Sequence, residues 1–268
     1  MGAGALAAVR RAALFPLSDV LPPPAGHPDR QVVVSGVPVG LDATAPFGFV
    51  CPEKIAAAEL GIVVEEVRDL LRREGRTRGV WFVPEAAEPL GLAERLRELG
   101  LEPHDEAPFE PRFASMALLE PPPAGPSDVD SHRARTLEEF AAGFRVTSAA
   151  FGVDAELAAA FDARSELLWP FQSEEGGAAA FVALVDGEVV GYGGAMFGAK
   201  AAFLSGSGTH PDHRGRGVYR SLVRARWDAA VARGTPALTV GAGAMSRPIL
   251  ERLGFSIVGW NDCLRDDF

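Results

Sequence analysis

Residues 202–220 of this 268-residue chain read AFLSGSGTHPDHRGRGVYR, and this stretch decides how the C-terminal half folds. An apolar run at Ala201–Leu204 is typical of a strand, and a turn containing Gly215 and Gly217 then leads directly into a helical pattern over residues 219–233. The first amides of a helix have no acceptor within the helix, and the helix dipole favours negative charge there. The order strand, glycine-rich turn, helix therefore predicts an anion site suited to a phosphate or pyrophosphate.

Arg214 and Arg216, the two arginines of the turn, add positive charge where the anion is expected. Two better-known glycine loops do not fit this stretch. The phosphate-binding loop of nucleoside triphosphatases requires Gly-Lys followed by Ser or Thr, and neither Lys-Ser nor Lys-Thr occurs in the chain. The dinucleotide-binding fingerprint requires a third glycine where Arg220 stands. A different kind of phosphate cradle is therefore indicated.

The segment Arg214–Tyr219, RGRGVY, resembles the acyl-coenzyme A loop of the GNAT N-acetyltransferase superfamily, whose pattern is Arg/Gln-x-x-Gly-x-Gly/Ala. Thr209–His213 is similar to the family's approach to this loop, and Ile249–Phe255 is similar to its closing Leu-Gly-Phe element. The resemblance implies that the backbone amides of residues 216–219 hold the pyrophosphate of coenzyme A. It also implies that the strand edge at 207–209 pairs with the pantetheine arm. The coenzyme A-binding residues implied in this way are Ser207, Gly208, Thr209, Arg214, Gly215, Arg216, Gly217, Val218 and Tyr219.

Two positions depart from the family pattern. Tyr219 stands where the family usually has a small residue, so its side chain either points away from the loop or narrows the coenzyme channel. Leu250 stands where the family often has a tyrosine that protonates the departing thiolate, and leucine has no proton to give. Either another residue serves or the thiolate leaves unaided. The candidates are Tyr192, Ser246, His210 and Cys263, and for each taken singly a structural role is favoured.

The general base for the amine stays open. The resemblance places acceptor sites beside two early helices, and the carboxylates on or after them are Asp162, Glu166, Glu174 and Glu175. The segment Trp169–Phe171 either forms an aromatic wall for a substrate or packs in the core, and the core is favoured. We expect no metal site.

Composition narrows the class of partner. The chain is 47% hydrophobic and 23% charged, which is typical of a soluble globular protein. Its net charge of −10 argues against a nucleic-acid partner and favours a cationic small-molecule substrate such as an amine. The sequence leaves open whether the protein is a monomer or a homodimer.

Several features favour a cytoplasmic protein. No apolar run is long enough to span a membrane, so we expect no membrane partner. Arg10 and Arg11 follow the apolar start instead of preceding it, which is the wrong order for a secretory signal. Cys51 and Cys263 lie far apart in the sequence, so we expect free thiols in a reducing compartment.

A proline-rich stretch divides the chain. Residues 121–126 contain four prolines, which favour a stiff, extended linker over 121–129. We therefore expect an N-terminal lobe over 1–120 and a GNAT domain over 130–268. The prolines at 22–24 indicate that the first 25 residues pack as a peripheral arm.

The expected fold class is α/β, a GNAT fold whose mixed twisted sheet is flanked by helices. In the C-terminal lobe we expect helices over 137–148 (capped by Thr136) and 154–168 (capped by Asp154), a hairpin 179–185/188–196 turning at Asp186-Gly187, strands 201–208, 237–240 and 255–260, and helices 218–233 and 246–253.

The N-terminal lobe shows a weaker echo of the same pattern. We expect a strand at 79–84, a helix at 90–99 ending in Leu-Gly-Leu, and a strand at 113–119. This order parallels the closing element of the C-terminal lobe, so we interpret the lobe as a degenerate GNAT-like half, with chance similarity as the alternative. It lacks an arginine-glycine loop and is not expected to bind coenzyme A.

The sequence supports three hypotheses for function. The first is an acetyl-coenzyme A-dependent N-acetyltransferase acting on the primary amine of a small molecule or on an α-amino group. The second is a catalytically silent acyl-coenzyme A-binding regulatory module. The third, acetylation of a peptide or protein, requires an open acceptor groove near residues 169–177.

Overall fold

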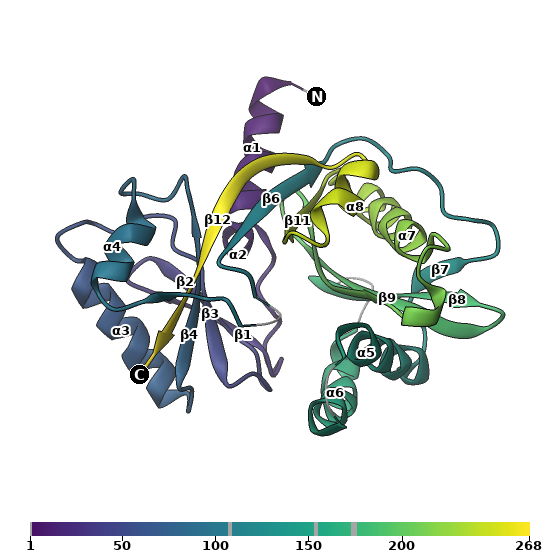
Figure 1. Cartoon of the computed structure of the whole chain (residues 1–268), viewed down its shortest axis with the longest axis horizontal. Coiled ribbons are helices and arrows are strands. Elements are labelled where there is room, and N and C mark those ends of the chain that lie inside the picture. Colours follow the sequence, from purple (N-terminus) through teal and green to yellow (C-terminus); the bar gives the residue numbers. More distant parts are fainter. Residues whose placement is uncertain (1, 107–108, 153–154, 173–175) are drawn as a thin grey trace.

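One mixed β-sheet runs through both lobes of the computed structural model, which describes residues 2–106, 109–152, 155–172 and 176–268 (Figure 1). Within these residues twelve strands form the sheet in the order β1-β2-β3-β4-β12-β6-β11-β10-β9-β8-β7, with β5 paired to β12. The strands are β1 Arg30–Val34, β2 Val37–Leu41, β3 Phe47–Val50, β4 Arg78–Pro84, β5 Glu102–Pro103, β6 Arg112–Leu118, β7 Asp130–Arg133, β8 Ala178–Val185, β9 Glu188–Phe197, β10 Ala202–Thr209, β11 Leu238–Ala242 and β12 Ser256–Asp267.

Helices cover the sheet in both lobes, as the expected α/β class requires. In the N-terminal lobe α3 and α4 share a hydrophobic core with β2, β3 and β4. In the C-terminal lobe α7 and α8 lie on one side of the sheet and α5 and α6 on the other (Figure 1). The helices are α1 Ala3–Leu14, α2 Pro16–Asp19, α3 Leu60–Arg73, α4 Leu92–Glu98, α5 Leu137–Phe151, α6 Ala155–Leu168, α7 Val218–Ala232 and α8 Arg247–Arg252, with short 3-10 turns at Trp169–Phe171 and Pro211–His213.

The local signals of the C-terminal lobe are confirmed. Thr136 caps α5, because its hydroxyl oxygen accepts a hydrogen bond of 3.1 Å from the amide of Glu139. The β8–β9 hairpin turns at Asp186 and Gly187, whose φ angles of 52° and 84° are those of a tight primed turn. The expected cap Asp154 lies outside the described residues.

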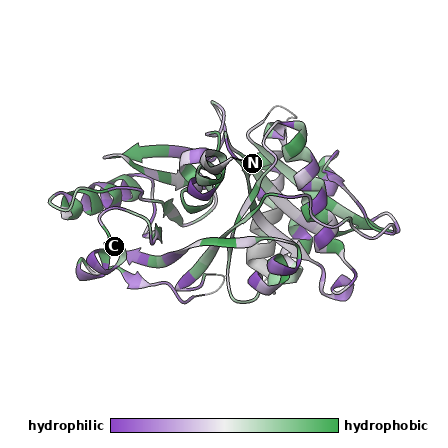
Figure 2. Ribbon diagram, turned by 90° about the horizontal axis from the view of Figure 1, so that it is seen from above, coloured by the Kyte–Doolittle hydropathy of each residue, from purple (hydrophilic) through white to green (hydrophobic). Residues whose placement is uncertain are grey.

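The last strand is longer than the sequence indicated. We expected a strand over 255–260, whereas β12 runs to Asp267 and pairs first with β6 and then with β4. The second half of β12 is rich in charge, so its composition resembles a surface tail. Cys263, Leu264 and Asp266 in this half are nevertheless buried. Figure 2 shows hydrophobic and hydrophilic stretches following one another along this strand.

The strand order does not follow the expected division of the chain into two lobes at residues 121–129. Residues 119–129 contain no helix or strand, as expected of a linker, and the division there stays a prediction. However, β6 belongs to the N-terminal range and lies between β11 and β12, while β12 ends in the N-terminal lobe. The linker also packs against α7: a Cβ atom on Gly125 would lie 2.6 Å from the Cβ of Ser221.

The expectation of a peripheral N-terminal arm was wrong. Val9 and Ala12 of α1 are buried and share a small core with Ala117, Ala201 and Ala237. Alanine at these positions lets α1 lie close to the sheet where the two lobes join. The arm therefore belongs to the body of the protein.

A buried ion pair joins α3 to the end of β12. The Asp266 side chain is 1% exposed and accepts hydrogen bonds of 3.0 and 2.6 Å from Nε and Nη2 of Arg68. Arg68 also reaches Glu65 on its own helix, so its guanidinium is held on both sides. The pair fixes the last strand beneath the helix of the N-terminal lobe.

We predict that Arg68→Met lowers the free energy of unfolding by about 3 kcal/mol, because it leaves the carboxylate of Asp266 buried without a partner. Urea unfolding followed by circular dichroism measures the loss. The control Arg73→Met, at an exposed position of the same helix, should change stability by less than about 0.5 kcal/mol. Equal effects of the two variants would contradict the importance of the buried pair.

Candidate functional site

The two central strands of the C-terminal lobe separate where a groove opens. β10 pairs with β11 only from Ala202–Leu204 to residues 238–240, although both strands continue further. On its other edge β10 carries an irregularity between Ser205 and Gly208, and Gly206 there has a φ of 52°. Beyond Leu204 the inner edge of β10 is therefore free of its neighbour, and its backbone groups face the groove.

The glycine-rich turn after β10 presents free amides at the start of α7. Gly215 and Gly217 adopt left-handed φ angles of 77° and 79°, which favour glycine. The first bond of the helix runs from the Ser221 amide to the Gly217 carbonyl at 3.0 Å. The amides of Val218–Arg220 consequently have no acceptor within the helix, which is the geometry of an anion site.

The two arginines of the turn are held by protein groups. Arg214 donates through Nη2 to the carbonyl of Ala150 at 2.9 Å, at the end of α5. Arg216 lies 3.3 Å from a carboxylate oxygen of Asp128 in the linker. Both guanidinium groups therefore brace the turn, and the anion cradle itself consists of backbone amides.

The separated strands and the turn line one groove of about 990 Å³. It is bordered by α8, by the end of α5 and by the start of the chain, and it extends to one face of the N-terminal lobe. Its predicted coenzyme-binding residues are Ser207, Gly208, Thr209, Arg214, Gly215, Gly217, Val218 and Tyr219, which the structure brings together; Arg216 lies in the same turn but does not line the groove.

The Tyr219 side chain turns toward the body of the lobe. Its ring packs against the hydrophobic core and lies 5.8 Å from the guanidinium carbon of Arg226. Burial raises the pKa of Tyr219, an effect that the nearby positive charge of Arg226 partly offsets. The ring thus contacts the core and Arg226, while Tyr219 is also one of the residues that line the groove.

Arg226 is a fully buried cation that the sequence analysis missed. It donates from Nη1 to the hydroxyl of Ser207 at 2.7 Å and to the carbonyl of Gly194 at 3.2 Å. Gly193 leaves room for it, since a Cβ atom there would lie 2.7 Å from Nη1. Burial lowers the pKa of Arg226. The arginine holds the irregular part of β10 that lines the groove, and only its position within the apolar stripe of a helix hinted at this role.

The two predicted proton donors differ in position: Ser246 lines the groove and Tyr192 does not. Tyr192 is buried beneath α5 among Phe140 and Phe144, and it does not line the groove. Burial raises the pKa of Tyr192 to about 12. Ser246 and Leu250 both line the groove.

His210 and the early carboxylates add little to the groove. The Nδ1 atom of His210 accepts a bond of 3.4 Å from the amide of Asp212, so the ring caps a turn. Glu166 is exposed on α6, while the Asp162 side chain and residues 174–175 lie outside the described residues. Trp169 packs against Phe140 in the core, as favoured from the sequence.

Both cysteines are free and buried, as expected. Cys263 lines the groove at a position next to the N-terminal lobe. Burial raises the pKa of the Cys263 thiol to about 12, and the same cause raises that of Cys51 to about 12. At neutral pH both groups are therefore protonated thiols.

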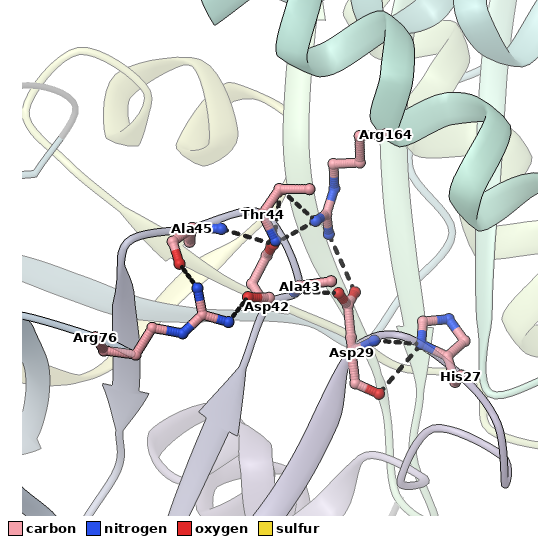
Figure 3. A network of polar contacts seen from close by, with 8 residues as sticks. All are labelled: His27, Asp29, Asp42, Ala43, Thr44, Ala45, Arg76 and Arg164. Carbon is pink, nitrogen blue, oxygen red and sulfur yellow. Dashed lines mark hydrogen bonds and ion pairs between the residues drawn. The ribbon is translucent and has the colours of Figure 1, made fainter. Parts of the chain in front are cut away.

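A polar cluster ties α6 to the N-terminal lobe, as Figure 3 shows. Arg164 on α6 donates to Asp29 at 3.0 Å, to the hydroxyl of Thr44 at 2.7 Å and to the carboxylate of Asp42. Arg76 binds the backbone of the same loop through the carbonyl of Asp42 at 2.8 Å. The cluster fixes the two lobes relative to each other on the side where α5 and α6 lie.

Comparisons with known proteins agree with this architecture. A GCN5-related N-acetyltransferase from Kribbella flavida superposes with a TM-score of 0.69 at 22% identity, covering 99% of this chain and 96% of that one. A tandem GNAT protein from the clavulanic acid biosynthesis pathway superposes with a TM-score of 0.60 at 18% identity, covering 86% and 78%. A GCN5-related N-acetyltransferase from Sphaerobacter thermophilus gives 0.58 at 18% identity, covering 86% and 76%. No curated protein matches the sequence.

The two-lobed chain therefore has the tandem arrangement of a GNAT fold, with a second, degenerate GNAT-like lobe at its N-terminus. Residues 144–255 match the model of the acetyltransferase (GNAT) family. These residues include the separated strands, the glycine-rich turn and the Leu-Gly-Phe element. These residues are therefore similar to the acetyltransferase domain of the GNAT family, whose members transfer acyl groups from acyl-coenzyme A. No helix among the described residues is long and apolar enough to cross a membrane.

We predict that the two thiols react slowly with a disulfide reagent at pH 8 in the folded protein, because a pKa of about 12 leaves only about one thiolate in 10⁴. The raised pKa keeps the reactive form scarce until the pH approaches 12. Absorbance at the wavelength of the released thiol measures the rate, and the same protein in denaturant is the control and should react rapidly. Rapid labelling of the folded protein would show that Cys263 is an exposed thiolate.

Proposed function

We propose that this chain is an acetyl-coenzyme A-dependent N-acetyltransferase that acts on the primary amine of a small molecule or on an α-amino group. One observation carries the proposal: the free edge of β10 and the free amides of the glycine-rich turn line the same groove. The turn suits a pyrophosphate, and the strand edge suits the peptide-like amides of a pantetheine arm. Ser207–Thr209 and the amides of 216–219 would hold these two parts.

Acetyl-coenzyme A, when bound, supplies the acetyl group as a thioester: its C–S bond breaks as the C–N bond of the amide forms, and the proton lost by the amine ends on the coenzyme thiol. A backbone N–H at the irregular part of β10 would polarise the acetyl carbonyl. Arg226 keeps that segment in place through Ser207. Ser246 lines the groove and stays the predicted donor of a proton to the sulfur, whereas Leu250 cannot serve.

Glu110 is the carboxylate best placed to take the proton of the amine. It lines the groove, and its two carboxylate oxygens accept bonds of 3.0 and 2.8 Å from the amide of Ala244, just after β11. None of the acidic residues considered from the sequence borders the groove in the described part of the chain. Glu110 precedes an N-terminal strand, so only the tertiary fold brings it here.

Contacts around residues 169–177 favour a small acceptor over a peptide. Phe171 packs against His27 with ring centroids 4.6 Å apart, and a Cβ atom on Gly177 would lie 3.0 Å from that of Leu21. Both partners belong to the N-terminal part of the chain. The open groove that a peptide substrate requires is therefore obstructed on this side.

We predict that Gly217→Asp abolishes acetyl-coenzyme A binding, because its carboxylate would repel the pyrophosphate at the helix start. Isothermal calorimetry measures the affinity. Gly217 has a left-handed φ and lies near Pro126, so any side chain strains the turn. Gly217→Ala carries this strain without the charge and is the matched control; it should lose far less affinity. If the two variants bind acetyl-coenzyme A with equal affinity, the pyrophosphate does not bind at the start of α7.

We predict that Arg226→Met weakens acetyl-coenzyme A binding by about tenfold, because β10 loses the charged donor that holds Ser207. The thermal midpoint should change little, since the variant also removes a buried charge that has no carboxylate beside it in the described residues. Arg224→Met, at a half-buried position of the same helix that does not line the groove, is the control for affinity. An unchanged affinity in Arg226→Met would rule out the positioning role.

Thiol release with a panel of amines tests the reaction itself. Release with any amine supports the transferase. Binding of acetyl-coenzyme A without release on any amine would favour the silent binding module instead, and no binding would exclude both functions.

A further inference from the structure

The sheet of the N-terminal lobe is apolar on both faces. Val50, Trp81 and Val83 point toward α3 and α4 and are at most 1% exposed. The residues that alternate with them, Phe49 and Phe82, point to the opposite face and are only half-buried. A sheet covered by helices on one face usually has polar residues on the other. Here that face carries phenylalanines instead.

Four of these rings form one surface, which we call the phenylalanine wall: Phe49, Phe82, Phe109 and Phe113. Phe82 lies 5.6 Å from Phe49, 6.2 Å from Phe109 and 5.3 Å from Phe113 between ring centroids. All four line the groove that begins at the glycine-rich turn. Phe109 also packs at 4.4 Å against the buried ring of His104, which supports the wall from behind.

Among the described residues that line the groove, Glu110 is the one acidic residue, and it lies beside the wall. Glu110 follows Phe109 in the sequence, and the bonds from the Ala244 amide hold its carboxylate at the end of β11. Gly243 makes this approach possible, because any Cβ atom there would collide with the carboxylate. Within the described residues no arginine, lysine or histidine forms an ion pair with Glu110. The carboxylate is thus held in place and available to a cation.

The other polar groups of this region satisfy one another. Ser115 accepts a bond of 2.6 Å from the side-chain amide of Asn261 and donates one of 2.9 Å to the carbonyl of Ala13. Cys263 is a protonated thiol. Glu110 is therefore the residue of this part of the groove that can bind a positively charged group.

We propose that the phenylalanine wall and Glu110 select an arylalkylamine, a primary amine with an aromatic body, as the acetyl acceptor. The ring of the substrate packs against the wall, and its ammonium group approaches the carboxylate before losing a proton to it. The inference rests on the proposed function and names its substrate class. The net charge of −10 further favours the approach of a cation.

A long acyl chain on the coenzyme is the competing occupant of the wall. Such a chain would bury the charged Glu110 carboxylate beside methylene groups with the Ala244 amide as its partner but without a counter-charge, which is unfavourable. An arylalkylamine satisfies both the apolar wall and the charge, so the observations favour the amine.

Calorimetric titration of two amines into the coenzyme A-loaded protein tests the inference without relying on turnover. We expect 2-phenylethylamine to bind about 10- to 100-fold more tightly than butylamine, the gain from burying an aromatic ring. Phe82→Ala should remove most of this preference, and Phe82→Leu, which keeps apolar volume, should remove part of it. Phe268→Ala, on the α3 side of the same sheet, is the control and should retain the preference. Glu110→Gln should weaken both amines about tenfold.

Equal binding of the two amines, or an unchanged preference in both Phe82 variants, would overturn the inference. Tighter binding of octanoyl-coenzyme A than of acetyl-coenzyme A, lost in Phe82→Leu or Phe82→Ala, would assign the wall to an acyl chain and overturn it as well. Thiol release measured on the same amines separates the two proposals. If the thiol is released but the two amines bind equally, only the aromatic selectivity is overturned. If 2-phenylethylamine binds more tightly but no thiol is released, acetyl transfer is overturned and the amine site remains supported.

Discussion

Backbone pairing along β12 holds the two lobes in one continuous sheet. Its first half pairs with β6 and its second half with β4, so a single strand spans the junction. The buried pair between Arg68 and Asp266 fixes the far end of this strand, and α1 packs over the junction. Because the sheet is continuous, a face of the N-terminal lobe is presented to the groove of the C-terminal lobe.

The groove itself results from interrupted pairing at the centre of the C-terminal lobe. β10 leaves β11 after Leu204, and the free edge needs support from below. Arg226 gives that support through Ser207 and Gly194, in space left by Gly193. A buried arginine without a carboxylate costs free energy. Arg226 lies beneath β10, and its bonds to Ser207 and Gly194 are consistent with a role in positioning that strand and not in stabilising the protein.

The part of the site that is local in sequence could be predicted from the sequence. The segment Arg214–Tyr219 contains its own turn glycines and the start of its helix, so strand, cradle and helix follow from neighbouring residues. The orientation of Tyr219 could not be predicted, because it depends on Arg226, about two turns further along α7. The sequence also could not show that Tyr192, a candidate proton donor, lies away from the groove, because its face of the sheet is covered by α5.

The sequence by itself determined the GNAT-like order of elements in the C-terminal lobe, the β8–β9 hairpin, the Thr136 cap and the glycine-rich turn before α7, because each depends on contacts between residues close together in the chain. Tertiary structure alone decided the course of β12, whose charged second half becomes a strand only when β4 is beside it. It also decided the acceptor side of the groove. The phenylalanine wall and Glu110 come from strands and loops that are distant in sequence, and only sheet pairing places them opposite the cradle.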